Sequence, residues 1–424
     1  MSTTEILTEV KALTKRWFAL SPKEPFIPGK SKIGLAVPSY DWEEAYEAIE
    51  SILTTQVTMG EKVKQFEEAF AKYVGVPYAV MVNSGSSANL LALSILSNPL
   101  TKNGIKRGDE VITPAVTWVT TVYPIIQVGA VPVLVDVDLD TFNISVREIE
   151  KAVTPKTKAI MLVHLCGNPC QMEIMDIARK HNLLVIEDSC ESHGAEVDGQ
   201  KVGSFGDLST FSFFFTHHIS TIEGGMVLTR SEEYAELAKA MRAFGWIRDL
   251  KDRERIAARY SHIDPKILFI TTGYNLRPTD IQGAFGIHQI KKLDRFIDMR
   301  RENARYWTES LRQFPYLLLH EERPGTKHVW HHYPVTVKPD APFTRKELVD
   351  FLQKKGLETR PIMTGNMAEQ PVMRLFEHRT VGDLPNSRII QRHSFLFGIH
   401  QGIGKQEREA VVDYFREFMY KVRL

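Results

Sequence analysis

Two adjacent histidines, His217 and His218, occupy a polar turn between two apolar segments of the chain. Residues 206–215, rich in phenylalanine and hydroxyl side chains, predict a buried strand before the turn, and residues 224–228 predict a second strand after it. Histidine is the side chain whose ordinary pKa lies closest to neutrality, so a histidine placed where a buried strand surfaces can act as an acid or a base. A pair of solvated turn histidines is the alternative interpretation of this segment alone.

An earlier turn, rich in glycine and serine, has the residue types of a phosphate site. Residues 83–88 follow the apolar run 78–82 and precede an apolar helical pattern. The first N–H groups of a helix are free and lie at the positive end of its dipole, so the backbone at Gly85 and the hydroxyls of Ser86 and Ser87 could bind phosphate. A plain serine cap of the helix explains the same residues.

Three further segments place candidate ligand contacts near the ends of predicted elements. Asp188 ends a predicted strand, at the sheet edge where open α/β proteins bind ligands, and its carboxylate could pair with a protonated heteroaromatic nitrogen or cap a helix. Trp118 follows another predicted strand and could stack on a flat ligand or anchor the core. Asn275 and Arg277 lie in a turn that could meet anionic oxygens or simply start a helix.

Composition and charge exclude several classes of protein. The 424 residues include 43% hydrophobic and 25% charged residues, with a formal net charge of +1, as in ordinary globular proteins. No run of like charge predicts a nucleic-acid or membrane surface, no apolar stretch approaches the ~20 residues that span a bilayer, and the N-terminus lacks the apolar core of a signal peptide. These features predict a cytoplasmic protein with neither nucleic acid nor membrane as a partner.

The three cysteines, Cys166, Cys170 and Cys190, are too few for a disulfide framework. They also fall short of the four thiolates that iron–sulfur clusters normally require, and His164 or His193 would have to complete any zinc set. We therefore expect ordinary buried thiols and no metal site.

Short apolar runs alternate with helical patterns through the middle of the chain, which is typical of a doubly wound α/β domain. The predicted strands are residues 110–114, 131–138, 159–164 and 183–188, with helices at 146–153 and 172–180 between them. Helical patterns also cover residues 231–244 and 280–314, and a strand at 329–337 precedes helices at 345–355 and 406–421. We expect a helical preface at residues 1–30, a large α/β domain at 31–290 and a smaller α+β domain at 291–424.

In chain order, the phosphate turn, the tryptophan, the carboxylate and the histidine turn together indicate a site for pyridoxal phosphate (PLP). From about Lys32 to its C-terminus the chain resembles the nucleotide-sugar aminotransferase family of fold-type I PLP enzymes. The markers of this resemblance are residues 60–67, 83–88, 117–118, 187–188, 203–207, 223–225 and 273–275. It implies the aspartate aminotransferase-like fold, with a large, mainly parallel sheet domain, a smaller C-terminal α+β domain, and a homodimer with a shared active site.

The resemblance also implies cofactor roles for individual residues. Asp188 would pair with the pyridinium nitrogen of the cofactor, and Trp118 would stack on the face of its ring. The remaining cofactor contacts would come from Gly85, Ser86, Ser87, Glu191 and Ser212, with Asn275 arriving from the partner subunit.

Members of the family that transfer amines hold the cofactor through a lysine, and here that position is His217. The change resembles the sugar 3-dehydratase branch, in which histidine serves as acid and base without tethering the cofactor. It implies removal of the C3 hydroxyl of a nucleotide-linked 4-keto-6-deoxyhexose, with GDP-4-keto-6-deoxymannose expected as the substrate and L-glutamate regenerating pyridoxamine phosphate (PMP). This chemistry would serve deoxysugar synthesis for O-antigen lipopolysaccharide. Substrate contacts are expected from His218, Arg277, His332 and Arg360.

Three other functions fit part of the pattern: a nucleotide-sugar aminotransferase, a CDP-4-keto-6-deoxyglucose 3-dehydratase, and a noncatalytic relative that keeps the cofactor site. The related CDP-sugar enzyme has the same histidine but adds a two-iron cluster, with cysteines after the segment that matches Gly245. Residues 246–272 of this chain contain no cysteine, so we expect no iron–sulfur cluster. The intact Asp188, Ser212 and Trp118 argue against loss of catalysis by decay.

Overall fold

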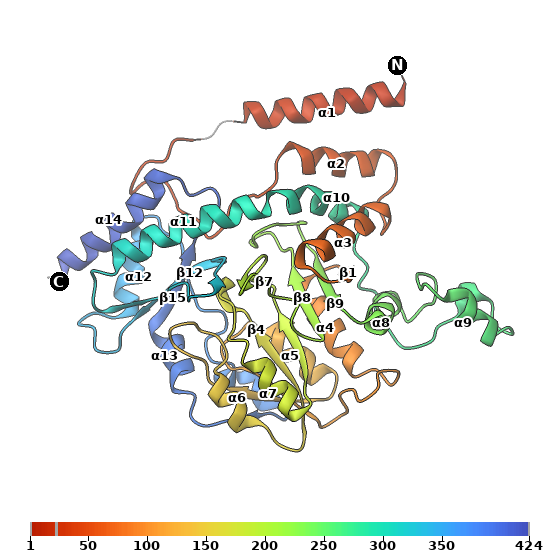
Figure 1. Ribbon diagram of the computed structural model, residues 1–424. Coiled ribbons are helices and arrows are strands. Elements are labelled where there is room, and N and C mark those ends of the chain that lie inside the picture. Colours follow the sequence, from red (N-terminus) through yellow and green to blue (C-terminus); the bar gives the residue numbers. More distant parts are fainter. Residues whose placement is uncertain (1, 22–23, 423–424) are drawn as a thin grey trace.

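A mixed eight-stranded sheet forms the centre of the larger part of the molecule (Figure 1). The computed structural model describes residues 2–21 and 24–422. From edge to edge the strands are β1 (Tyr78–Val82), β9 (Gly225–Thr229), β8 (Leu208–Ser212), β5 (Leu184–Asp188), β4 (Thr157–Val163), β2 (Glu110–Pro114), β3 (Val131–Val135) and β14 (Arg379–Thr380). β9 is antiparallel to both neighbours and the other pairs are parallel, which confirms the predicted mainly parallel sheet.

Helices cover both faces of this sheet, which explains why its strands are apolar on both sides. Successive strand residues face opposite ways. Val111 and Ile186 therefore pack in one core cluster with α4 (Gly85–Leu96) and α8 (Glu232–Arg242). Their neighbours Ile112 and Val185 pack in another with α6 (Val146–Ala152) and α7 (Ile174–His181). The surrounding helices are α2 (Trp42–Leu53), α3 (Glu61–Val74), α4 (Gly85–Leu96), α5 (Val119–Gln127), α6 (Val146–Ala152), α7 (Ile174–His181), α8 (Glu232–Arg242) and α10 (Asp280–Gln289).

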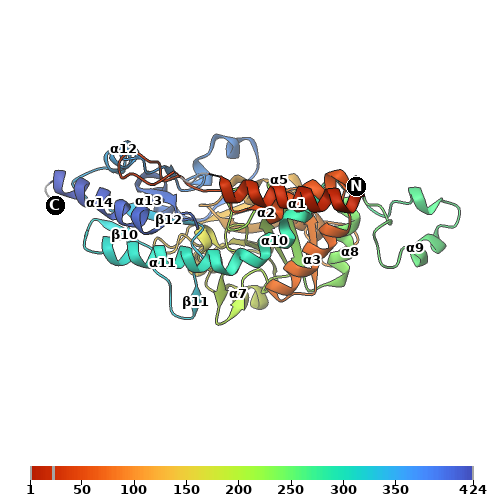
Figure 2. The ribbon, with the colours of Figure 1, turned by 90° about the horizontal axis from the view of Figure 1, so that it is seen from above.

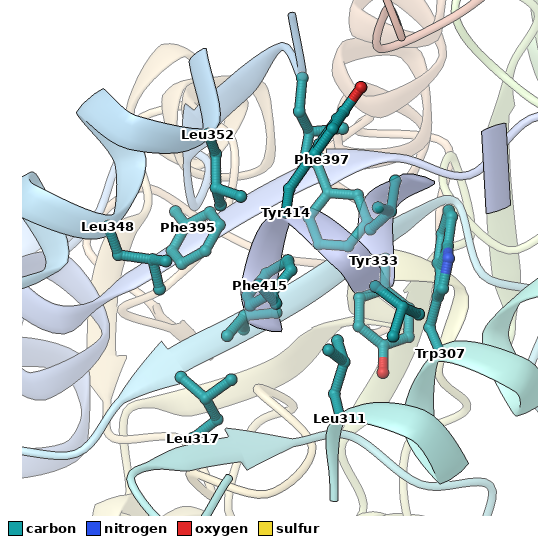
Figure 3. Packing of buried hydrophobic residues seen from close by; sticks show 14 of the residues in the cluster. Trp307, Leu311, Leu317, Tyr333, Leu348, Leu352, Phe395, Phe397, Tyr414 and Phe415 are labelled. Carbon is teal, nitrogen blue, oxygen red and sulfur yellow. The ribbon is translucent and has the colours of Figure 1, made fainter. Parts of the chain in front are cut away.

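A smaller antiparallel sheet packs against the long C-terminal helices. Its strands, in spatial order, are β10 (Leu317–Leu319), β12 (His332–Val337), β15 (Ser394–Gly398) and β13 (Thr359–Pro361), and its helices are α11 (Leu293–Leu311), α12 (Arg345–Lys354), α13 (Pro385–His393) and α14 (Lys405–Lys421). Figure 3 shows the core between them. The indole of Trp307 meets the rings of Tyr333 and Phe397 edge-on, at centroid distances of 5.3 and 5.0 Å, a preferred aromatic geometry.

The start of β12 differs from the sequence prediction, which placed residues 329–337 in one strand. β12 begins only at His332, because the backbone before it bonds to the turn that follows β4. The Val329 N–H donates to the Gly167 carbonyl over 2.9 Å, and the His331 N–H donates to the Cys166 carbonyl over 2.8 Å. A Cβ on Gly167 would lie 2.8 Å from the Trp330 nitrogen, so only glycine permits this approach.

Two helices lie outside these layers (Figures 1 and 2). α1 (Thr3–Leu20) runs beside α2 at the surface and buries none of its residues. α9 (Arg253–Arg259) projects from the body on the excursion between α8 and α10, and it also buries none. None of the helices within the described ranges is long and apolar enough to cross a membrane. The domain boundaries at residues 30 and 290 stay a prediction.

Asp136, directly after β3, joins the C-terminal part of the chain to the large sheet. Its carboxylate accepts hydrogen bonds from the Asn386 N–H (2.9 Å), the Ser387 N–H (2.8 Å) and the Ser387 hydroxyl (2.6 Å). These N–H groups belong to the first turn of α13, where helix donors have no partner within the helix. The buried carboxylate therefore caps α13 and ties it to the end of β3.

We expect Asp136→Ala to lower the free energy of unfolding by about 2–4 kcal/mol, because charge-assisted hydrogen bonds are lost and the α13 donors stay buried without partners. Asp140→Ala removes an exposed carboxylate nearby and serves as the control. Urea unfolding followed by circular dichroism measures both. Equal stability of the two variants would contradict this role of Asp136.

Candidate functional site

Asp188 ends β5 at the carboxyl edge of the large sheet, and its side chain is 5% exposed. Its Oδ2 accepts hydrogen bonds from the Asn89 amide and the Thr121 hydroxyl, both over 2.8 Å, and its Oδ1 accepts from the Cys190 N–H over 3.2 Å. These donors are neutral, and no lysine, arginine or histidine of the described ranges forms an ion pair with it. A buried carboxylate held in this way suits a ligand that brings a positive charge.

Asn89 and Thr121 were not singled out from the sequence. Both are buried polar residues on helices, Asn89 on α4 and Thr121 on α5, among mainly apolar buried residues. That isolated polarity is the sequence signal that could have revealed them, because a buried amide or hydroxyl requires a hydrogen-bond partner.

The predicted phosphate turn forms the start of α4, beside the end of β8. Ser84 caps the helix by accepting the Ser87 N–H over 3.1 Å. The backbone at Gly85 is packed so closely against Ser212 that a Cβ would lie 2.4 Å from the Ser212 Cβ. Ser86 is exposed and Ser87 is partly exposed. The structure thus brings the first turn of α4 and the Ser212 hydroxyl together, as a phosphate cradle requires.

His217 lies in the turn between β8 and β9, five residues after Ser212, the last residue of β8. Its ring is partly buried, and its Nδ1 has no hydrogen-bond partner among the described residues. Burial, together with the charge of Arg300, lowers the pKa of His217 to about 3, so its imidazole is neutral near pH 7. His218 is fully buried, and its Nε2 lies 2.9 Å from the carbonyl oxygen of Val329.

Further histidines surround His217. The ring of His331 lies 4.7 Å from that of His217, the ring of His193 lies 5.9 Å from it, and His332 meets His331 edge-on at 4.2 Å. Arg300, on α11, is 2% exposed and donates to the carbonyls of Trp330 and His331. Burial and this nearby positive charge keep the pKa values of His193, His218 and His331 well below the ordinary value.

Glu191 is the acidic neighbour of this histidine cluster. Its Oε2 accepts the Cys166 N–H over 2.7 Å, and its Oε1 lies 3.7 Å from the Nδ1 of His331. Burial raises the pKa of Glu191 to about 8, with a smaller contribution from the charge of Asp188. Its carboxyl group is therefore mainly protonated at neutral pH, and it can donate a hydrogen bond as well as accept one.

The other predicted site residues, Trp118, Asn275, Arg277 and Arg360, are exposed or partly exposed. The ring of Trp118 is 54% exposed at the start of α5, as a surface for stacking would be. Asn275 is exposed and accepts a hydrogen bond from Arg277, whose guanidinium lies over the ring of Phe244 at 5.2 Å. Arg360 is exposed on β13. The structure does not bring Asn275, Arg277 or Arg360 into any hydrogen bond or ion pair with His217 or Asp188.

The chemistry of this site fits a phosphorylated aromatic cofactor better than a metal. Within residues 2–21 and 24–422, no group of three or more His, Cys, Asp or Glu residues is arranged to hold a metal ion. The cradle at Gly85 and Ser212 provides neutral donors for an anion, the Asp188 carboxylate suits a cationic ring nitrogen, and the exposed indole of Trp118 offers a flat face.

Comparison with known proteins gives the family of the chain. A model of the DegT/DnrJ/EryC1/StrS aminotransferase family matches residues 39–416. The chain belongs to this family. The resemblance found from the sequence motifs is thereby confirmed, and the stretch that falls outside the match at the N-terminus includes all of α1.

Relatives within this family include sugar dehydratases. A GDP-4-keto-6-deoxy-D-mannose 3-dehydratase of Yersinia pseudotuberculosis is 41% identical over 379 residues, covering 88% of this chain and 95% of that protein. An Escherichia coli GDP-4-keto-6-deoxy-D-mannose 3-dehydratase with bound hydrated PLP is 37% identical, with a TM-score of 0.85 and coverage of 92% and 99%. A GDP-4-keto-6-deoxymannose 3-dehydratase with a trapped PLP-glutamate adduct, also 37% identical, has a TM-score of 0.85 and coverage of 91% and 99%.

The raised pKa of Glu191 predicts how the free energy of unfolding depends on pH. The unfolded chain releases the Glu191 proton near pH 4.5, whereas the folded chain keeps it until about pH 8, so this group stabilises the fold less and less as the pH rises between those values. We therefore expect the stability advantage of Glu191→Gln over the natural chain to grow by about 2 kcal/mol or more between pH 5 and pH 8.

Urea unfolding of both proteins at pH 5 and pH 8 measures this difference. Glu309→Gln, at an exposed position on α11, is the control and should follow the natural chain at both pH values. A constant difference between Glu191→Gln and the natural chain would show that Glu191 does not hold a proton in the folded protein.

Proposed function

We propose that this protein is a PLP- and PMP-dependent sugar 3-dehydratase that removes the C3 hydroxyl of GDP-4-keto-6-deoxymannose. The observation that carries the proposal is His217, a neutral histidine in the turn where lysine holds the cofactor in relatives that transfer amines. The chain contains no lysine between Lys201 and Lys239, so none in or near this turn can replace it. The relatives named 3-dehydratases, matched over nearly their full length, support the same reaction.

The residues of the site would hold the cofactor without a covalent bond. Asp188 would bind the protonated ring nitrogen, Trp118 would cover the ring face, and Ser86, Ser87 and Ser212 would bind the phosphate together with the α4 N-terminus. When bound, the group supplies an amine that condenses with the C4 ketone and a ring that delocalises negative charge. Asn89 and Thr121 would orient Asp188 toward that ring.

His217 would move the protons of the reaction. Because its imidazole is neutral near pH 7, a ring nitrogen is available to accept a proton. The imidazolium that results can return that proton to the C3 oxygen, so that the hydroxyl leaves as water. A lysine at this position would compete by forming a covalent bond, and histidine avoids that reaction.

The substrate side of the proposal rests on charge and on the relatives. Arg277, which is partly exposed, and Arg360, which is exposed, would provide positive charge for the anionic oxygens of a sugar nucleotide. The buried His218 and His332 would contribute from beneath the site. L-glutamate would regenerate the amine form of the cofactor, as the relative with a trapped PLP-glutamate adduct suggests. The product, a 3-deoxy-4-keto sugar nucleotide, would enter deoxysugar and lipopolysaccharide synthesis.

The decisive assay combines the protein with PLP, L-glutamate and GDP-4-keto-6-deoxymannose and follows the sugar nucleotide by mass spectrometry. We expect loss of one oxygen from the sugar and release of ammonia. Gain of an amine group would instead establish an aminotransferase. Turnover of only the CDP-linked sugar would show that the substrate carries CDP rather than GDP. The absence of a reaction with either sugar would favour the interpretation of the chain as a noncatalytic cofactor-binding protein.

We expect His217→Asn to slow dehydration by about 10²–10⁴-fold, because asparagine cannot carry the proton. His262→Asn, at an exposed histidine on the excursion between α8 and α10, is the matched control and should keep full activity. Near-full dehydration by His217→Asn would overturn the assignment of the base. Absorbance of the bound cofactor in both variants confirms that the site is still loaded.

We also propose that two copies of the chain share their active sites. Apolar side chains are exposed in the segments that carry predicted site residues, as expected for a surface that a second copy covers. Trp118, the two residues Phe214 and Ile222 in the turn of His217, and Phe244 beneath Arg277 are each more than 40% exposed. Asn275, exposed and without a hydrogen bond to Asp188, Ser212 or His217 of its own chain, would complete the phosphate cradle of the partner.

Shared sites predict complementation between inactive variants. His217→Asn and Asn275→Asp should each lose activity alone, yet a mixture of the two, allowed to exchange subunits, should recover about a quarter of the natural activity. This recovery follows because each mixed dimer has one intact site. Analytical ultracentrifugation establishes the dimer, and a mixture with no recovered activity would show that each site is built from one chain.

A further inference from the structure

The imidazole of His217 lacks the contact that usually orients a histidine that moves protons. In most such sites the second ring nitrogen makes a hydrogen bond that sets the tautomer and the angle of the ring. The Nδ1 of His217 is buried and has no such partner within the described part of the chain. Its backbone is held, since its N–H donates to the Phe214 carbonyl over 3.0 Å, but this bond leaves the side chain free to rotate.

Flat side chains surround the ring instead. His331 is the nearest, with 4.7 Å between ring centroids and 31° between ring planes. His193 lies at 5.9 Å and 47°, and Phe214 meets the ring edge-on at 6.4 Å and 78°. Of these three neighbours, His331 is therefore the one whose face lies against the face of His217.

His331 is itself held firmly. Its N–H donates to the Cys166 carbonyl and its own carbonyl accepts a hydrogen bond from Arg300 over 3.0 Å. The side chain is 4% exposed, and Glu191 lies 3.7 Å from its Nδ1. Neither ring nitrogen of His331 has a hydrogen-bond partner among the described residues, so packing accounts for the position of this ring.

We propose that His331 is a positioning residue whose ring packs against the imidazole of His217 and sets its orientation toward the bound sugar. The inference rests on the proposed role of His217 and adds a residue to it. Because His331 is neutral, its contact with His217 is one of shape and dispersion rather than proton exchange. The titratable and charged groups that face this pair are His193, His218, His332, Glu191 and Arg300.

The test compares three substitutions of His331 that separate ring shape from polarity. His331→Phe keeps a flat ring without nitrogen atoms, His331→Gln keeps polarity without a ring, and His331→Leu keeps neither. We expect His331→Phe to retain kcat within about 3-fold, and the other two to lose about 10-fold or more in kcat with little change in KM for the sugar nucleotide. His320→Phe, a buried histidine packed on Phe142 away from the site, is the matched control and should keep full activity.

A second readout uses the protein without cofactor. The ring signals of His217, identified by their loss in His217→Asn, are followed by NMR in protein labelled at histidine. His331→Phe should keep one set of shifted ring signals, whereas His331→Leu and His331→Gln should move them toward the values of a mobile histidine, with the midpoint of thermal unfolding nearly unchanged.

Two results would overturn the proposal. Full activity of His331→Leu would show that the ring contact has no role, and equal loss in His331→Phe and His331→Gln would show that a nitrogen atom of His331 is required. If the proposed function itself were wrong, the natural chain would also show no dehydration. The NMR comparison reports the orientation of His217 whatever the reaction is, so the two failures are distinguishable.

Discussion

The buried carboxylate of Asp188 is the constraint on which the site depends. It lies at the end of β5 among neutral donors, and a charge in this position is stable only if a cation joins it or if its hydrogen bonds are kept intact. Asn89 on α4 and Thr121 on α5 supply those bonds. The same two helices begin at the phosphate cradle and at Trp118, so the elements that satisfy the carboxylate also position the other two sides of the cofactor site.

The charges and burial around His217 favour its neutral form, which can act as a base, over the protonated form. Several buried histidines and Arg300 crowd into one region, and each additional positive charge there would repel the others. The histidines therefore stay neutral beside the charged Arg300, and the protonated Glu191 adds no negative charge to offset a proton on His217. A proton taken up by His217 is held weakly under these conditions, which suits the proposed role of passing a proton on to a leaving hydroxyl.

Much of the large sheet could be predicted from the sequence, because strands buried on both faces form short apolar runs and their ends define the ligand edge. β2 and β5 were found nearly residue for residue for this reason. The start of β12 was not predicted correctly. Residues 329–331 have the apolar and aromatic residue types of a strand, but their backbone bonds to a distant turn at Cys166 and Gly167. The order of the motifs led to Asp188, Ser212 and His217. Asn89 was missed although its polarity stands out on an apolar helix face, whereas Arg300 and His331 lie at the site through tertiary contacts that leave no local pattern.

The close approach at Gly167 has a consequence for how this protein can change over evolution. Any side chain at that position would push against the backbone of Trp330 and His331, more than 160 residues farther along the chain, and the ring of His331 lies against that of His217. Substitution of residue 167 is thus coupled, through the backbone of His331, to the surroundings of His217. Homologous sequences in which glycine is lost there should carry compensating changes at the position of His331, and that covariation would be visible in an alignment of close relatives.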